Sequence, residues 1–127
     1  IGVRDLDPGE KKYVKDNGIK CYTMSDVARL GLDTVITKGL KHLQDCDGIH
    51  LSFDVDSLDP AEMPGTGTKV DGGIFLGDMI LALNILSESE KLVSADLVEV
   101  NPLLDDRDET ARKAVILAEY IFGKTLL

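Results

Sequence analysis

The sequence predicts an α/β fold built around a largely parallel sheet. Short apolar runs alternate along the chain with segments of helical periodicity, which is the pattern of successive βα units. Two of the apolar runs end in acidic residues, at the position where the strands of open α/β sheets deliver ligand-binding side chains. The 127 residues suffice for one domain, or part of one, and no linker or repeat divides them.

The expected elements follow from local signals taken in chain order. Strands are expected at residues 1–4, 19–23, 49–54 and 94–100. Helices are expected at residues 8–16, 26–30, 34–43, 76–86 and 109–122. Pro8 suits the first turn of the first helix, and Ser25 and Asp33 are expected to cap the next two. The last two helices carry apolar residues at helical spacing, which predicts a core-facing stripe on each.

Composition limits the classes of partner. The chain has 23 acidic and 14 basic residues, a formal net charge of -9, which disfavours binding to nucleic acid or to an anionic membrane. No apolar run approaches the roughly 18 residues of a membrane span. Cys21 and Cys46 lack metal-binding spacing and are expected to be buried apolar side chains without a disulfide. We therefore expect a cytoplasmic protein with a cationic ligand.

The most informative segment is residues 49–60, where an apolar run ends in Asp54, Asp56 and Asp59. A strand places residues i and i+2 on one face, so Asp54 and Asp56 are expected to project together, with Val55 opposite. Two adjacent carboxylates repel, and one needs a raised pKa unless a cation balances them. Metal ligation is therefore favoured over the alternative of turn formers or helix caps, the role expected for Asp59.

Other interpretations of this acidic run fit less well. A phosphatase of the DxD type needs a hydroxyl-bearing or β-branched residue four positions after the first Asp, where Leu58 stands. An EF-hand fails at Leu58 and at Asp59, which replaces the required Gly. His42 is expected on an exposed helix turn and His50 near the start of a strand, so neither is predicted as a ligand or base.

Further polar groups are expected near the same sheet edge. Glu99 follows the fourth strand, where it suits a cationic group such as a guanidinium, the alternative being a cap for the following turn. Residues 60–73 are rich in Gly, Pro and Thr, and a loop of this length is often functional. The loop offers the Thr68 hydroxyl but lacks the spacing of a phosphate-binding P-loop.

Four segments together resemble the ureohydrolases, and arginase more closely than agmatinase. They are residues 3–10 (VRDLDPGE), 52–60 (SFDVDSLDP), 63–68 (MPGTGT) and 98–102 (VEVNP). The resemblance covers residues 1–127 as the C-terminal portion of a single arginase-like domain that lacks its N-terminal half. It implies a three-layer α/β/α fold with a mostly parallel sheet, present here only in part.

The resemblance also implies a reaction and a cofactor. It implies a centre of two Mn²⁺ ions and hydrolysis of L-arginine to L-ornithine and urea by metal-activated hydroxide. Asp54 would bridge both ions and Asp56 would bind one. The whole protein would form a trimer or hexamer.

The resemblance further assigns substrate contacts. Glu99 and Thr68 would line the guanidinium end of the site. Asp7, with Glu10, would hold the α-amino group of the substrate. Asp5 would lie nearby.

The family's His-containing metal motifs and its proton-shuttle His would lie upstream of Ile1. The chain is therefore expected to be an excised part holding half a site, inactive alone, with no certain catalytic residue of its own. The alternatives are a non-catalytic folded oligomerisation module and an agmatinase-type ureohydrolase. A truncated parallel sheet exposes apolar face and edge, so the isolated chain is expected to self-associate.

Overall fold

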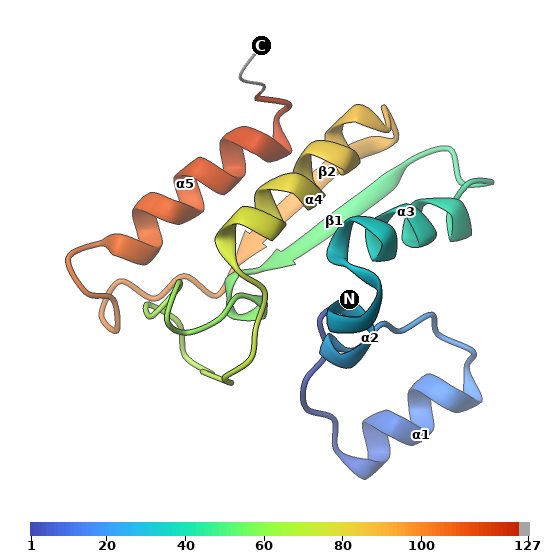
Figure 1. Cartoon of the computed structure of the whole chain (residues 1–127), viewed down its shortest axis with the longest axis horizontal. Coiled ribbons are helices and arrows are strands. Elements are labelled where there is room, and N and C mark those ends of the chain that lie inside the picture. Colours follow the sequence, from blue (N-terminus) through green and yellow to red (C-terminus); the bar gives the residue numbers. More distant parts are fainter. Residues whose placement is uncertain (125–127) are drawn as a thin grey trace.

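The computed structural model describes residues 1–124 as a short parallel sheet with helices packed against it (Figure 1). The elements are α1 (Pro8–Asp16), α2 (Met24–Leu30), α3 (Leu32–His42), β1 (Ile49–Asp54), the 3₁₀ turn η1 (Val55–Ser57), α4 (Leu76–Glu88), β2 (Leu92–Val98) and α5 (Glu109–Ile121). Among the described residues, none of these helices has the length and apolarity to cross a membrane.

The sheet consists of β1 and β2, which pair in parallel. Phe53 lies opposite Leu97 and Asp54 opposite Val98, so the two strands end at the same level. The connection between them runs through α4, as expected for a βα unit. Asp54 and Glu99 are thereby brought to the same edge of the sheet, and the predicted parallel pairing is confirmed.

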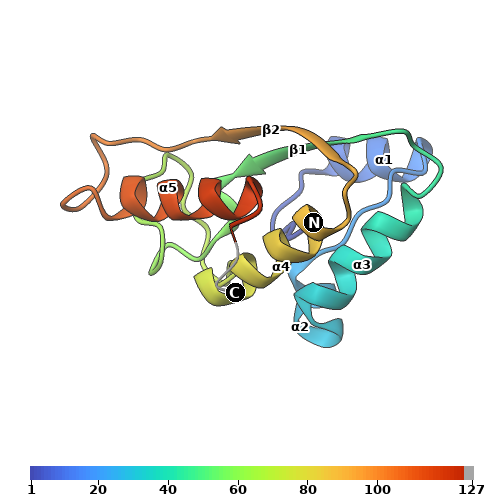
Figure 2. The same cartoon turned by 90° about the horizontal axis from the view of Figure 1, so that it is seen from above.

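The helices α3, α4 and α5 lie side by side on one face of the sheet, with α4 in the middle (Figures 1 and 2). The core between the layers is apolar, and Phe53 from β1, Leu83 from α4 and Leu117 from α5 are all buried. Burying one such side chain stabilises the fold by about 1.5–3 kcal/mol relative to leaving it exposed. The predicted core-facing stripe of α4 is confirmed. That of α5 is confirmed at Tyr120 and Ile121 but is wrong for Val115 and Phe122, which are exposed, because Ala114 and Leu117 face the core instead.

The opposite face of the sheet is open in the described part of the chain. Val93 is 70% exposed and Val98 is 38% exposed, and His50 and Ser94 lie exposed on the paired strands. The described residues therefore form two layers, a sheet and one layer of helices. The expected apolar exposure is confirmed, and self-association stays a prediction.

The prediction of two N-terminal strands, at residues 1–4 and 19–23, is wrong. Residues 1–4 and 19–23 meet only at one isolated parallel bridge, between Val3 and Thr23. Gly2 has a left-handed φ of 81°, which interrupts the extended backbone on one side. On the other side Thr23 turns at once into the N-cap of α2.

The boundaries of the other elements also differ from those expected, apart from α1 (Pro8–Asp16) and β1 (Ile49–Asp54), which are both confirmed. Thr23, not Ser25, caps α2, and Asp26 completes its capping box. The helix α3 begins at Leu32, ahead of Asp33. The strand β2 begins two residues earlier than expected and ends before Glu99, whose left-handed φ of 67° breaks the extended chain.

The cysteines are both free, as expected, but only partly buried. Cys21 is half-buried and Cys46 is exposed in the turn after α3. The prediction of buried apolar side chains is therefore wrong for Cys46, because the chain leaves the core at the end of α3.

The loop of residues 60–73 is fastened to α5, even though no strand or helix forms within it. The Gly65 N–H donates to the buried Thr110 hydroxyl at 2.7 Å, and the Gly65 carbonyl accepts from the Asn101 N–H at 2.8 Å. The Lys113 ammonium donates to the Glu62 carbonyl. Asp105 accepts the N–H groups of Thr110 and Ala111, which holds the start of α5 in place.

Replacing Thr110 with Val tests this attachment. Thr110→Val keeps the shape of the side chain but leaves the Gly65 N–H without its buried acceptor. We expect the free energy of unfolding to fall by about 1–3 kcal/mol, measured by chemical denaturation.

Thr37→Val is the matched control, because the exposed Thr37 hydroxyl donates only to the Asp33 carbonyl of its own helix. We expect the control to change the free energy of unfolding by no more than about 0.5 kcal/mol. Equal effects of the two substitutions would contradict the assigned role of Thr110.

Candidate metal centre

The paired carboxylates lie on a turn, and not on one face of a strand as expected. β1 ends at Asp54, and residues Val55–Ser57 form η1. The Asp54 carboxylate accepts the Asp56 N–H at 2.9 Å, and the Ser57 hydroxyl donates to the Asp54 carbonyl at 2.6 Å. The strand-alternation argument is therefore wrong for Asp56, because Asp54 bends the backbone by capping the turn that follows.

The turn nevertheless brings both carboxylates into one hollow. This acidic hollow, of about 380 Å³, is lined by residues of the N-terminal segment, of η1 and of the loop. Asp54, Asp56 and Thr68 all line it, as does Asp5. Three of the six residues expected to form the site therefore lie together, next to the N-terminal segment, which is far from them in the sequence.

Negative charge accumulates in the acidic hollow. The pKa of the Asp56 carboxyl is raised above its usual value, first by burial and then by the charge of Asp54. The charge of Glu99 raises the Asp56 pKa further, while the Arg4 guanidinium lowers it. The direction agrees with the raised pKa expected for one of two adjacent carboxylates, although burial of Asp56 contributes more to it than the charge of Asp54. A divalent cation would relieve this repulsion, and carboxylate oxygens are ligands that Mn²⁺ and Mg²⁺ prefer, so the donor set fits part of a metal site.

Arg4 is a residue of the acidic hollow that the sequence pattern does not reveal. Its guanidinium lines the acidic hollow and donates to the carbonyls of Asp56 and Ser57, the latter at 2.8 Å. The available signal was a single basic residue directly before the acidic residues Asp5 and Asp7. The apolar pattern of residues 1–4 instead predicts that Arg4 is part of a strand.

Asp59 closes the loop that carries Thr68. Its carboxylate accepts the N–H groups of Ala61 at 3.0 Å, Gly72 at 2.9 Å and Gly73 at 3.1 Å. A Cβ at Gly73 would overlap backbone atoms of Leu58 and Asp59, so only glycine permits this closure. The predicted turn-forming role of Asp59 is confirmed, and it extends to both ends of the loop.

The remaining predicted substrate contacts lie outside the lining of the acidic hollow. Glu99 is exposed just beyond β2, within electrostatic reach of Asp56. Asp7 and Glu10 form a reciprocal capping box at the start of α1, with both hydrogen bonds at 2.8 Å. Both are exposed, and their carboxylates stabilise the helix by this capping.

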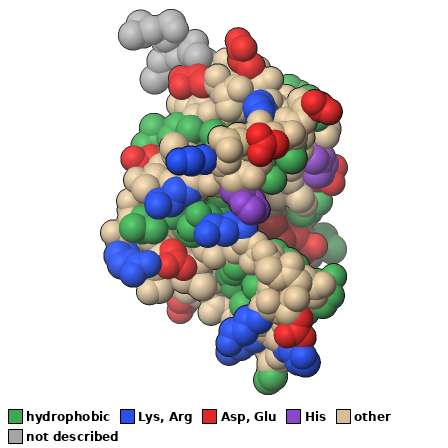
Figure 3. Space-filling model, turned by 90° about the vertical axis from the view of Figure 1, so that its right-hand side faces the viewer, with side chains coloured by type: hydrophobic (Ala, Val, Ile, Leu, Met, Phe, Trp, Pro, Cys, Tyr) green, Lys and Arg blue, Asp and Glu red, His purple; other side chains and the backbone are tan. Residues whose placement is uncertain are grey.

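Neither histidine belongs to the acidic hollow. Histidine side chains are visible at the surface in Figure 3, and both His42 and His50 are exposed. His50 contacts Ser94 at 2.8 Å and Asp96 at 3.3 Å on the open face of the sheet. Within residues 1–124, no group of three or more His, Cys, Asp or Glu side chains is arranged to hold a metal ion. The described chain thus holds a pair of candidate ligands.

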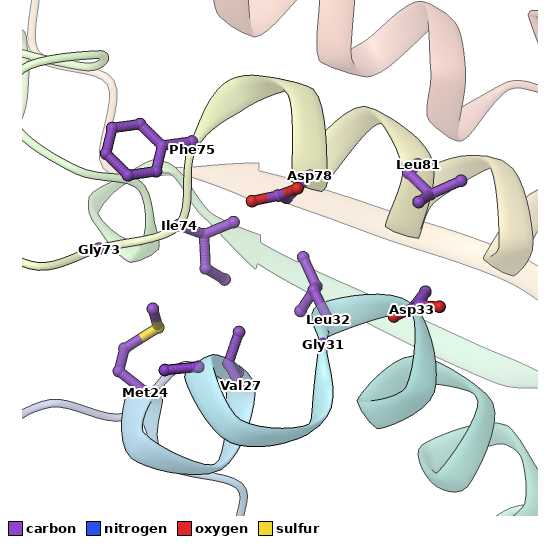
Figure 4. Close-up of a pocket in the computed structure, with 11 residues that line it drawn as sticks. Met24, Val27, Gly31, Leu32, Asp33, Gly73, Ile74, Phe75, Asp78 and Leu81 are labelled. Carbon is purple, nitrogen blue, oxygen red and sulfur yellow. The ribbon is translucent and has the colours of Figure 1, made fainter.

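A second hollow lies between α2, α3 and the start of α4 (Figure 4). Met24 and Val27 of α2 face Ile74 across it, and its lining is mainly apolar. Asp33 and Asp78 are its only acidic lining residues. It contains none of the residues predicted from the sequence to bind metal or substrate, so chemistry favours the acidic hollow as the candidate site.

The fold and the acidic hollow define part of a parallel α/β protein whose site lies at the carboxyl edge of its sheet. Residues 1–123 match the sequence model of the Arginase family. The chain belongs to the arginase family, and its fold is part of the α/β fold of arginases.

Individual relatives agree with this assignment. The chain is 50% identical over 129 residues to an arginase of Staphylococcus aureus (strain MRSA252), covering 100% of this chain and 43% of the relative. A crystal structure of arginase from Bacillus subtilis superimposes with a TM-score of 0.97 at 48% identity, covering 99% of this chain and 45% of that one. An Entamoeba histolytica arginase in complex with L-ornithine gives a TM-score of 0.90 at 37% identity, covering 97% and 42%. The chain thus spans less than half the length of these relatives.

The loop closure by Asp59 has a testable pH dependence. The pKa of Asp59 lies below its usual value of 3.8, chiefly because the Ala61 N–H donates to it, with Gly72 and Gly73 adding to the effect. The carboxylate therefore contributes stability above pH 3.8, and this contribution is lost as the pH falls through the folded-state pKa.

We expect Asp59→Asn to lower the midpoint of thermal unfolding at neutral pH. The difference from the wild type should shrink as the pH falls below 3.8. Asp47→Asn, in the exposed turn after α3, is the control and should follow the wild type throughout. A difference for Asp59→Asn that stays constant down to acidic pH would contradict the role of its charge.

Proposed function

We propose that this chain forms the C-terminal part of an arginase, which hydrolyses L-arginine to L-ornithine and urea with two Mn²⁺ ions. Membership of the arginase family supports the reaction class. The observation that carries the proposal is the pair Asp54 and Asp56, facing one hollow together with Thr68. Manganese and the substrate remain part of the proposal, because the chain spans 43% of its relative's length.

In this proposal the paired carboxylates hold the cations. Asp54 would bridge the two ions and Asp56 would bind one, with the further ligands coming from the rest of the complete protein. When bound, the ions supply a water whose pKa is lowered to near neutrality, the usual contribution of such metals to hydrolysis. Without them, Arg4 is the one group in the described part of the chain that offsets the negative charge around Asp56.

The substrate contacts follow from charge complementarity. Glu99 lies within electrostatic reach of the acidic hollow and would accept hydrogen bonds from a guanidinium, while the Thr68 hydroxyl lines the hollow itself. Hydrolysis would then form a bond between the guanidinium carbon and the water oxygen and break the bond between that carbon and the side-chain nitrogen. The two protons of the water would end on that nitrogen, so that urea and the ammonium form of ornithine are released. The complex of the Entamoeba histolytica arginase with L-ornithine is consistent with this product class.

Asp7 and Glu10 would bind the α-amino group of the substrate in addition to capping α1. Exposed capping carboxylates are free to accept further hydrogen bonds, since each oxygen has two lone pairs. A positively charged amino group would therefore add to the capping box without displacing it. The complete protein would assemble as a trimer or hexamer.

The first test is Asp54→Asn in the complete protein. This substitution keeps the shape of the side chain and removes one negative charge from the proposed centre. We expect manganese-dependent urea release from L-arginine to fall by roughly 10²–10³-fold, because metal catalysis contributes several kcal/mol.

Asp47→Asn, on the exposed turn after α3, is the control and should retain wild-type activity. Urea release by the wild type without any divalent metal, or undiminished activity of Asp54→Asn, would contradict the proposal.

The second test separates capping from substrate binding at Asp7. Asn caps helices about as well as Asp, so Asp7→Asn should leave thermal unfolding nearly unchanged. It removes the charge that would bind the α-amino group, and we expect kcat/KM for L-arginine to fall roughly 10–100-fold. 5-Guanidinopentanoate is arginine without that amino group, so any turnover of 5-guanidinopentanoate should be unaffected. A parallel loss for both substrates would contradict the assignment.

A further inference from the structure

We propose that Arg4 is a positioning residue of the metal centre, which holds η1 in the conformation that presents Asp54 and Asp56 to the acidic hollow. This inference rests on the proposed metal-binding function of that pair. It concerns a contact between the N-terminal segment and the metal-binding turn, and Arg4 itself is not a ligand because a guanidinium has no free lone pair for a cation.

The geometry of the contact is specific. Arg4 Nη1 donates to the Ser57 carbonyl at 2.8 Å, and Arg4 Nη2 donates to the Asp56 carbonyl. These are two consecutive carbonyls of one short turn, so the guanidinium restrains two neighbouring peptide planes at once. The contact spans more than 50 positions in the sequence and is partly buried.

Arg4 adds to a small set of hydrogen bonds that hold η1. Within the turn and its flanks, Asp54 accepts from the Asp56 N–H and, through its carbonyl, from the Ser57 hydroxyl, and the Leu58 N–H donates to the Val55 carbonyl at 3.2 Å. The Ile74 N–H also donates to the Ser57 carbonyl, at 3.0 Å. Repulsion between Asp54 and Asp56 favours conformations in which the two carboxylates separate. Arg4 opposes that separation from the other side of the hollow.

Attachment of the N-terminal segment does not itself require this fork. Val3 already forms a bridge with Thr23, and the Met24 N–H donates to the Val3 carbonyl at 3.0 Å. The backbone bonds therefore tie residues 2–3 to the start of α2. The Arg4 side chain adds a contact in a different direction, toward η1.

The planar fork also explains why arginine stands here. Two nitrogens of one rigid group reach two carbonyls, whereas a lysine ammonium is a single point of charge on a flexible stem. Arg4→Lys would keep the positive charge in the hollow and lose the paired restraint. Arg4→Met would lose both.

The test is the Mn²⁺ affinity of the complete protein and its variants, measured from free Mn²⁺ by electron paramagnetic resonance. We expect the Kd to rise roughly 10–100-fold in both Arg4→Lys and Arg4→Met, the usual cost of losing a group that orients metal ligands. Excess Mn²⁺ should restore urea release, with the KM for L-arginine unchanged. Arg29→Met is the control, because Arg29 is exposed on α2 and pairs only with Asp26; its Kd should equal that of the wild type.

A wild-type Kd in either Arg4 variant would overturn the proposal, as would a wild-type protein that binds no Mn²⁺. If Arg4→Met fails to fold, as judged by circular dichroism, Arg4→Lys decides the question because it keeps the charge and most of the stem. A different result would contradict the proposed reaction without affecting the proposed role of Arg4. A wild type that binds Mn²⁺ but releases no urea would contradict the arginase activity and leave the comparison of affinities valid.

Discussion

The repulsion among carboxylates at the carboxyl edge of the β1–β2 pair is the constraint around which the site is arranged. Parallel pairing in register ends both strands at one level and so places Asp54 and Glu99 at a common edge. Asp56 joins them through the turn η1, and its raised pKa reflects burial together with both neighbouring charges. Arg4 is the one positive group that lowers this pKa in the described chain. Such an arrangement is costly without a cation and favourable with one.

The surrounding fold holds this charge in place by hydrogen bonds from distant segments. Asp59 gathers the N–H groups at both ends of the loop, and α5 holds its middle through Thr110. Thr68 is thereby kept at the hollow by a loop that has no regular secondary structure of its own. The helices α3, α4 and α5 cover one face of the sheet and provide the apolar core that these bonds depend on.

Much of this arrangement could be predicted from the sequence because it depends on local signals. Pro8, the capping residues and the apolar stripes fix helix positions within a few residues, and the apolar run before Asp54 indicates a strand delivering carboxylates. The bend at Asp54 could not be predicted from alternation, since the side chain that ends the strand also caps the next turn. The fork from Arg4 depends on a contact between segments more than 50 positions apart, which no local pattern encodes. Likewise, Gly2 and the cap at Thr23 reduce two expected strands to a single bridge.

The most direct measurement is a crystal structure of the complete protein grown with Mn²⁺, with anomalous scattering recorded on both sides of the manganese edge. We expect two anomalous peaks at the acidic hollow. The Asp54 carboxylate should bridge them, and the Asp56 carboxylate should coordinate one of them. Arg4 should keep its two hydrogen bonds to the carbonyls of η1. Manganese peaks located elsewhere, or an acidic hollow without any ion at saturating Mn²⁺, would contradict the assignment of Asp54 and Asp56 as metal ligands.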